Sequence, residues 1–259
     1  MAYQKIILSK VGKIATITLN RPEVLNALDG DILEEIIDAI GDIEKDNNIW
    51  VVVLDSNCEK AFSSGIDVEF VKDYDPWTGR LIGKLLHRTF WAVRTLEKPV
   101  ISEINGLCLG AGLELAISGD ILIASDASKF GLPNINIGIP AIVEAAILLP
   151  AIGLFGTKEL CFTGKFWDVE RAKEFNLLNS VVAPGELKAE VKRWADLLAS
   201  KSPRGLATQK DIINKWMTTD LETAIDYSIQ TVTLNFVTKD QKEGMGAFLE
   251  KRDAKFTGE

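Results

Sequence analysis

Short apolar runs recur along the chain, separated by polar segments rich in glycine, proline, asparagine and aspartate. Residues 3–9 and 14–19 predict two strands, joined by a turn of hairpin length at residues 10–13. The continuous apolar run at residues 50–54 predicts a strand covered on both faces, and another strand is expected at residues 99–104. The first part of the chain therefore contributes strands to a sheet.

Helical periodicity alternates with these strands. Apolar residues recur three or four positions apart between residues 32 and 40, and Asp29 or Asp31 is expected to cap this helix. Residues 113–118 predict a second helix, followed by a strand at residues 121–124. Strands that alternate with helices are typical of the α/β class.

The pattern changes in the last part of the chain. Residues 203–216 and 221–236 predict amphipathic helices, and a further helix is expected at 239–251. We therefore expect a core at residues 1–190 and a helical segment at residues 191–259. The apolar side chains of these late helices suit either an intramolecular core or a subunit interface.

The charge balance excludes some classes of partner. The 259 residues carry a formal net charge of −8, and the sequence pI is near 4.9. Nucleic-acid and acidic-membrane binders need clustered Lys and Arg, so neither partner is expected. A phosphate-bearing small molecule needs only a few local cations and is not excluded.

Cysteine and histidine usage argues against disulfides and metal sites. Cys58, Cys108 and Cys161 form no CxxC pair, and His87 is the single histidine. We expect reduced thiols in a cytoplasmic protein without a metal. The first residues lack a secretory signal, and polar residues interrupt the apolar run at 135–152, so no membrane span is expected.

The most informative stretch is residues 106–120, which contains Gly110, Ala111 and Gly112 between a predicted strand and a helix. Small residues let a ligand approach the backbone, and the first N–H groups of a helix are unpaired. Such a turn suits an oxygen that becomes anionic during a reaction, and Glu114 adds a carboxylate one turn later. The alternative is a tight packing turn in which Glu114 offsets the helix dipole.

A second stretch, Lys-Ala-Phe-Ser-Ser-Gly-Ile-Asp at residues 60–67, follows a predicted strand. Together with Gly-x-x-x-Gly-Ala-Gly-Leu-Glu, it resembles the paired signatures of the crotonase family, the enoyl-CoA hydratase/isomerase superfamily. Further matching pieces occur in order at residues 19–22, 26–27, 129–133, 163–164, 172–182 and 243–252. The resemblance therefore spans essentially the whole chain.

The resemblance implies an architecture. It implies an α/β fold built as a crotonase-like spiral of ββα units, with the acyl-CoA site within residues 1–190. Residues 191–259 would form a C-terminal helical segment that mediates oligomerisation and closes the CoA site. The family typically forms homotrimers, often paired as hexamers.

The resemblance also implies catalytic roles. Backbone N–H groups of Ser64 and Ala111 would hold the thioester oxygen, and Glu114 would act as a general base. Asn134 stands where hydratases carry a second glutamate, and an amide orients water but transfers no proton. Glu144 matches a turn that carries the acid of some isomerases. Its alternative role is to offset a helix dipole.

A CoA crevice is implied by further matches. His87 has the spacing of an active-site histidine in the family's aryl-CoA dehalogenase branch; the alternative is a structural histidine. Lys251 resembles a late basic residue near the CoA phosphates, or it is a solvated helix charge. The remaining expected contacts are Val24, Leu25, Ser64, Gly65, Ile66, Asp67, Gly110 and Ala111.

These matches imply an acyl-CoA lyase of the enoyl-CoA hydratase type. Open alternatives are a double-bond isomerase, an acyl-CoA hydrolase and a catalytically silent CoA-binding subunit. Neither GxGxxG on a strand-to-helix turn nor GxxxxGK[ST] occurs in the sequence. The sequence therefore indicates neither a dinucleotide-binding fold nor a phosphate-binding loop. We expect no permanently bound cofactor, with coenzyme A entering as part of the substrate.

Overall fold

The computed structural model describes residues 3–259, and its larger sheet has six strands in the order β1-β2-β3-β5-β7-β10. All neighbours are parallel except β1 and β2, which form an antiparallel hairpin. The hairpin turn consists of Gly12 and Lys13 and is shorter than the turn expected at residues 10–13. The short turn is possible because Gly12 adopts φ +58°. The strands are β1 Ile6–Val11, β2 Ile14–Leu19, β3 Val51–Ser56, β5 Val100–Ile104, β7 Ile121–Ser125 and β10 Ser180–Val182.

A smaller sheet has four strands in the order β4-β6-β8-β9, with β4, β6 and β8 parallel. These strands are β4 Ala61–Ser63, β6 Leu107–Leu109, β8 Lys129–Gly131 and β9 Trp167–Asp168. The chain passes from β3 to β4, from β5 to β6 and from β7 to β8, so consecutive strands alternate between the two sheets. Helical segments return the chain each time, which confirms the expected α/β spiral of ββα units.

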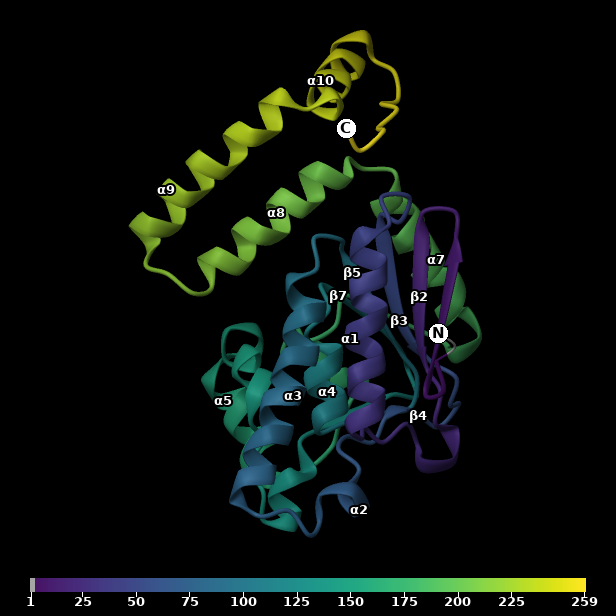
Figure 1. The fold of residues 1–259 in the computed structure, drawn as a ribbon, viewed down its shortest axis with the longest axis vertical. Helices are drawn as coiled ribbons and strands as arrows, with labels where there is room; N and C mark the ends of the chain where they lie inside the picture. The colour runs from purple at the N-terminus through teal and green to yellow at the C-terminus, as the bar shows by residue number, and fades with distance from the viewer. Residues whose placement is uncertain (1–2) are drawn as a thin grey trace.

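Helices α1, α3, α4, α5 and α7 lie around these sheets (Figure 1). Asp29 accepts a hydrogen bond from the N–H of Ile32 at 3.1 Å, so Asp29, and not Asp31, caps α1. The α-helices are α1 Gly30–Lys45, α2 Val68–Val71, α3 Pro76–Thr95, α4 Ala111–Ala116, α5 Leu148–Thr163, α6 Val169–Glu174, α7 Leu187–Ala199, α8 Pro203–Trp216, α9 Leu221–Val232 and α10 Lys239–Glu250. The 3₁₀ segments are η1 Pro22–Val24, η2 Pro133–Ile137, η3 Val143–Ile147, η4 Pro184–Glu186 and η5 Thr233–Val237.

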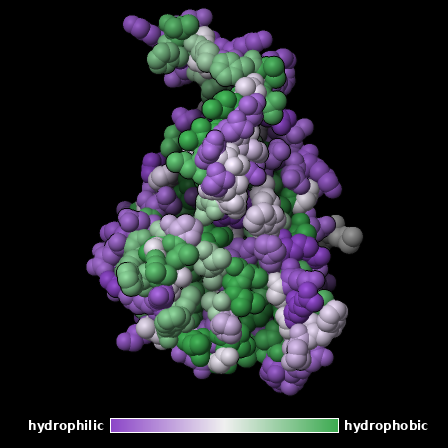
Figure 2. Space-filling model, turned by 90° about the vertical axis from the view of Figure 1, so that its left-hand side faces the viewer, coloured by the Kyte–Doolittle hydropathy of each residue, from purple (hydrophilic) through white to green (hydrophobic). Residues whose placement is uncertain are grey.

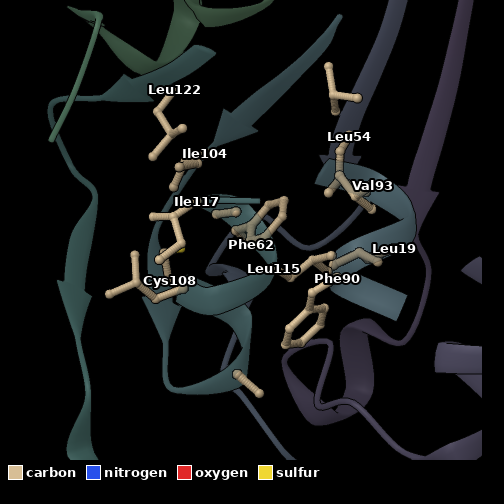
Figure 3. Close-up of a cluster of buried hydrophobic side chains, with 14 of the residues drawn as sticks. Leu19, Leu54, Phe62, Phe90, Val93, Ile104, Cys108, Leu115, Ile117 and Leu122 are labelled. Atoms are coloured by element: carbon tan, nitrogen blue, oxygen red, sulfur yellow. The ribbon is translucent and has the colours of Figure 1, made fainter. Parts of the chain in front are cut away.

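The main hydrophobic core lies between the two sheets and helices α1, α3 and α4. Phe62 of β4, Phe90 of α3 and Phe130 of β8 are fully buried there. Figure 3 shows Phe62 and Phe90 with Cys108 and Leu115 in this cluster. This packing holds α4 against β4 and β6, so the turn that begins α4 has a fixed position.

Helix α7 covers the opposite face of the larger sheet. Leu187, Val191 and Ala195 pack there in a second cluster with Val53 and Ile101. The boundary expected between residues 190 and 191 falls inside α7, and the helices that leave the core begin only at α8.

Helices α8, α9 and α10 project beyond the two sheets as a separate lobe (Figure 1). The Nζ atom of Lys210 on α8 lies 2.7 Å from Oδ2 of Asp120, and Lys210 also donates to the carbonyl of Lys98. This ion pair, in which the side chain of Lys210 is only 9% exposed, fastens α8 to the core. Large apolar side chains on the lobe remain exposed, among them Trp216, Ile225, Ile229, Leu234, Phe236 and Phe248.

Within residues 3–259, the stretch Val143–Thr163 alone is long and apolar enough by composition to cross a membrane. It joins η3 to α5, contains Glu144, and is interrupted at Gly153 by φ +76° and ψ 168°. An interrupted helix leaves backbone groups unpaired, which a bilayer interior tolerates only where protein covers them. Figure 2 shows apolar side chains gathered on the face that carries α5, where Leu149, Leu154, Phe155 and Phe162 are exposed.

Candidate active site

The site lies where the parallel strands β4, β6 and β8 end. The carboxyl ends of parallel strands meet at one edge of a sheet, which is where ligands bind in α/β proteins. The N–H of Gly110, after β6, donates to the carbonyl of Gly131 in β8 at 2.9 Å. A Cβ atom placed on Gly65, after β4, would lie 3.4 Å from the nitrogen of Ala111. The two stretches that the sequence singled out are therefore in contact.

This contact between backbones requires glycine on both sides. Gly65 has φ +101° and Gly110 has φ +53°, conformations that L-residues with side chains rarely adopt. A Cβ on Gly65 would also come within 2.9 Å of the carbonyl oxygen of Leu109. The close approach brings the backbone after β4 against the backbone after β6.

The structure changes the expected pair of N–H donors. The N–H of Ser64 already donates to the carbonyl of Leu25 at 2.9 Å, so it is not free to bind a substrate oxygen. Ile66 forms a parallel bridge with Leu28, in which Leu28 donates to the carbonyl of Gly65 and accepts the N–H of Asp67. The N–H of Ile66 itself therefore points away from Leu28. Within the described part of the chain, the N–H groups of Ile66 and Ala111 have no hydrogen-bond acceptor. The available pair is therefore Ile66 and Ala111.

Sequence reasoning placed Ile66 only among the CoA contacts. The segment Phe-Ser-Ser-Gly-Ile-Asp offers several N–H groups, and its residue types do not show which one is already paired. That distinction depends on the bridge to Leu28, which lies far away in the sequence.

Glu114 is buried beside this pair of donors. It projects from α4 with 2% of its surface exposed, and its Oε1 accepts the N–H of Ala145 at 3.1 Å. Burial and, to a smaller extent, the negative charge of Glu144 raise the pKa of Glu114 to about 8, against the lowering effect of the Ala145 N–H. A carboxyl group with such a pKa exchanges a proton near neutral pH, as a general base requires.

Glu144 lies in η3 and is 4% exposed. Its Oε1 is 2.8 Å from Nδ1 of His87, and its Oε2 is buried without a hydrogen-bond partner in residues 3–259. Burial raises the pKa of Glu144, while the hydrogen bond to His87 opposes the rise. Val143 adopts φ +31°, a strained conformation for a β-branched residue, so the turn before Glu144 stores strain. Glu144 is thus a second buried carboxyl group near Glu114.

Asn134 occupies η2 next to the same turn. A Cβ atom on Gly110 would lie 3.4 Å from its Oδ1, and this Oδ1 is buried without a partner among the described residues. An unpaired buried amide oxygen is available to accept a hydrogen bond from water or substrate.

The expected CoA contacts from the first part of the chain also lie together. The Oγ of Ser64 donates to the carbonyl of Val24 at 3.4 Å, which places η1 beside the loop after β4. Asp67 accepts the N–H of Phe70 at 3.4 Å and forms an ion pair with Arg21 at 3.3 Å. Asp67 therefore has a structural role as the cap of α2, whatever its contact with a ligand.

Lys251 is not brought to this site within one chain. It follows α10 and is exposed. Figure 1 places α10 at the opposite end of the molecule from β4 and α2. The structure described here also contains no group of three or more His, Cys, Asp or Glu side chains arranged to hold a metal ion.

Comparisons with known proteins point to one family. The profile of the enoyl-CoA hydratase/isomerase family matches residues 9–259. The chain is 38% identical over 253 residues to the short-chain-enoyl-CoA hydratase of Clostridium acetobutylicum, with 97% of both chains covered. It is 37% identical to the crotonyl-CoA hydratase of Syntrophomonas wolfei, with 99% of both covered.

Solved structures show the same fold. An enoyl-CoA hydratase subunit I from Geobacillus kaustophilus superposes with a TM-score of 0.95 over all of both chains, at 32% identity. The enoyl-CoA hydratase of Bacillus anthracis gives a TM-score of 0.94, covering 99% of this chain and 100% of its own, at 31% identity. These matches confirm the crotonase-like fold, and the chain belongs to the enoyl-CoA hydratase/isomerase family.

Proposed function

We propose that this chain is an enoyl-CoA hydratase that adds water to, or removes it from, short 2-enoyl-CoA thioesters. The observation that carries the proposal is a buried carboxyl group, Glu114, beside two N–H groups, of Ile66 and Ala111, without an intramolecular acceptor. The full-length similarity to hydratases of short-chain and crotonyl-CoA supports the substrate class.

In this mechanism the thioester oxygen accepts hydrogen bonds from Ile66 and Ala111. Attack of water on the β-carbon moves charge onto that oxygen, and each aimed donor stabilises the enolate by about 3 kcal/mol. Glu114 takes a proton from the attacking water. Asn134 helps to orient this water through its amide.

The second proton must reach the α-carbon. We assign this step to Glu144, because its Oε2 is buried, unpaired in the described structure and close to Glu114. Burial favours the protonated form of Glu144, as an acid requires. Glu144 therefore takes the task that a second glutamate at position 134 has in two-glutamate relatives.

A double-bond isomerase is the second candidate. Glu144 is close enough to Glu114 for its charge to raise the pKa of Glu114, and one carboxylate is sufficient to move a proton between two carbons of a bound enolate. No feature of this site specifically favours a thioester hydrolase or a silent CoA-binding subunit.

We further propose that coenzyme A lies in a crevice between η1 and the loop after β4. Val24 and Leu25 form one wall, and Ser64, Gly65, Ile66 and Asp67 the other, with Gly110 and Ala111 at the thioester. No cofactor is bound permanently. Lys251 reaches the CoA phosphates only from another copy of the chain, which suits a homotrimer or hexamer. The exposed apolar side chains of α5 and α9 would be covered in that assembly.

We also propose that the protein acts in the cytoplasm. Cys58, Cys108 and Cys161 are free thiols, and burial raises the pKa of Cys108 and Cys161. Reduced, buried thiols suit a reducing compartment.

The proposal is tested by incubating the purified protein with saturated, 2-enoyl and 3-enoyl CoA thioesters and following the products by mass spectrometry. Hydration of 2-enoyl-CoA, seen as a mass gain of one water, is the expected result. An isobaric shift of the double bond alone would favour the isomerase. Free CoA would indicate a hydrolase, and no turnover would indicate a silent subunit.

A further inference from the structure

His87 lies between solvent and a buried carboxyl group. It projects from the middle of α3, and 55% of its side chain is exposed. Its Nδ1 atom is 2.8 Å from Oε1 of Glu144, whose side chain is only 4% exposed. One end of the imidazole ring therefore contacts the buried acid, while much of the ring remains in water.

The two oxygens of Glu144 have different surroundings. Oε1 is bound to His87, whereas Oε2 is buried and has no partner in the described structure. Glu114 accepts the N–H of Ala145, the residue after Glu144, so both carboxyl groups border the same short segment. Arg94 adds a positive potential that lowers the pKa of Glu144 against the effect of burial. One oxygen thus contacts the half-exposed imidazole of His87, and the other is buried without a partner in the described structure.

We propose that His87 positions Glu144 and returns a proton from solvent to it in each turnover. The inference rests on the proposed function, in which Glu144 protonates the α-carbon. When the Oε2–H bond breaks and the α-carbon–H bond forms, Glu144 becomes a carboxylate stabilised by the Nδ1–H of His87. Nε2 of His87 then takes a proton from water, and Nδ1 passes its proton to Oε1.

Protons balance over the cycle. Rotation of the reprotonated carboxyl group of Glu144 brings its proton back toward the site. Glu114 releases to solvent the proton that it took from the attacking water. The turnover therefore adds one water to the substrate and consumes no net proton.

The charged groups around His87 include one side-chain hydrogen-bond partner, Glu144. Glu144 faces it from η3, and Glu44 of α1 lines the same surface depression as His87 and Arg88. Arg88, the next residue on α3, is already engaged in an ion pair with Glu34 of α1. In residues 3–259, Glu144 alone is hydrogen-bonded to His87 through a side chain.

The test compares His87→Ala, which removes both functions, with His87→Asn, whose amide N–H occupies a position close to that of Nδ1 but cannot relay a proton. We expect each variant to lower kcat for crotonyl-CoA hydration by about tenfold or more, with KM little changed. Free imidazole should restore His87→Ala. In the Glu144→Gln background, His87→Ala should have no further effect. Arg88→Gln, a neighbouring exposed position, is the matched control and should keep wild-type kcat.

The inference is overturned if His87→Ala keeps the wild-type kcat, or if it lowers kcat equally in the wild-type and Glu144→Gln backgrounds. Either result leaves the proposed function intact. Failure of the wild type to hydrate crotonyl-CoA would instead count against the proposed function. In that case, exchange of an α-proton of butyryl-CoA with deuterated water still decides the role of His87. Slower exchange in His87→Ala with rescue by imidazole supports it, and unchanged or absent exchange contradicts it.

Discussion

The side-chain amide of Asn134 lies against Gly110, with Oδ1 3.4 Å from the position that a Cβ atom on Gly110 would take. Asn134 therefore lies beside the turn that carries the N–H of Ala111. Its buried Oδ1 lacks a hydrogen-bond partner in the described residues, which suits a position that is filled only when ligand or water binds.

Asn134→Glu should therefore rescue a protein that lacks the acid Glu144. We expect Glu144→Gln to lower kcat for crotonyl-CoA hydration on the order of 10²-fold, and the double variant to recover at least about tenfold of this loss. Steady-state kinetics of the four proteins measure this cycle. If the double variant is no faster than Glu144→Gln, position 134 does not face the α-carbon.

The donor role of Ala111 has a conservative test. Ala111 is the first residue of α4, where proline is tolerated because the N–H has no helical partner. Ala111→Pro removes the donor and should lower kcat by about 10²- to 10³-fold. Circular dichroism and thermal unfolding check that the fold is kept. A folded variant with nearly full kcat would show that this N–H does not hold the thioester oxygen.

Much of the fold was predictable from sequence pattern, because strands and helices leave a periodic signature. The predicted helix at residues 203–216 coincides with α8, and the predicted strand at 121–124 lies within β7. The turn that carries Ala111 and Glu114 was also recognisable, since a glycine-rich turn between a strand and a helix is a local feature.

Non-local pairings were not predictable. The choice of Ile66 over Ser64 depends on Leu25 and Leu28, which are brought alongside by the fold. The contact between His87 and Glu144 joins residues 57 positions apart and requires α3 to lie against η3. No spacing in the sequence encodes either relationship.

The pH dependence of activity should reflect Glu114. Because its pKa is raised to about 8, mainly by burial, the free protein carries the reactive carboxylate only as the pH approaches and passes that value. We expect kcat/KM for crotonyl-CoA to rise with pH between about 6 and 8. A profile that is flat over this range would contradict the assignment of Glu114 as the base.

The same shift affects stability. A carboxyl group whose pKa is higher in the folded protein binds more protons there, so its stabilising contribution is complete below the unfolded pKa and is lost as pH rises through about 8. Glu114→Gln removes this pH-dependent contribution to the free energy of unfolding. Relative to wild type, its free energy of unfolding from urea titrations should therefore increase from pH 5 to pH 8. A constant difference would show that the pKa is not raised.

The ion pair between Lys210 and Asp120 should anchor the C-terminal lobe. Lys210→Ala removes a cation that is only 9% exposed and leaves the 30% exposed carboxylate of Asp120 unpaired, which we expect to lower the free energy of unfolding by about 2 kcal/mol. The double variant Lys210→Met, Asp120→Asn removes both charges and should lose less. Urea unfolding at neutral pH measures both. A loss below about 1 kcal/mol in Lys210→Ala would mean that the pair behaves like an exposed one.

The most direct test of the account is the kcat of crotonyl-CoA hydration by Glu114→Gln, measured beside Glu103→Gln. Glu103 is a matched control, because burial raises its pKa to about 7 and it lies in β5 near Lys188 of α7, away from the site. We predict a loss on the order of 10²- to 10⁴-fold for Glu114→Gln and a near-wild-type kcat for Glu103→Gln. Near-full turnover by a folded Glu114→Gln variant would contradict the central claim that this carboxylate activates the water.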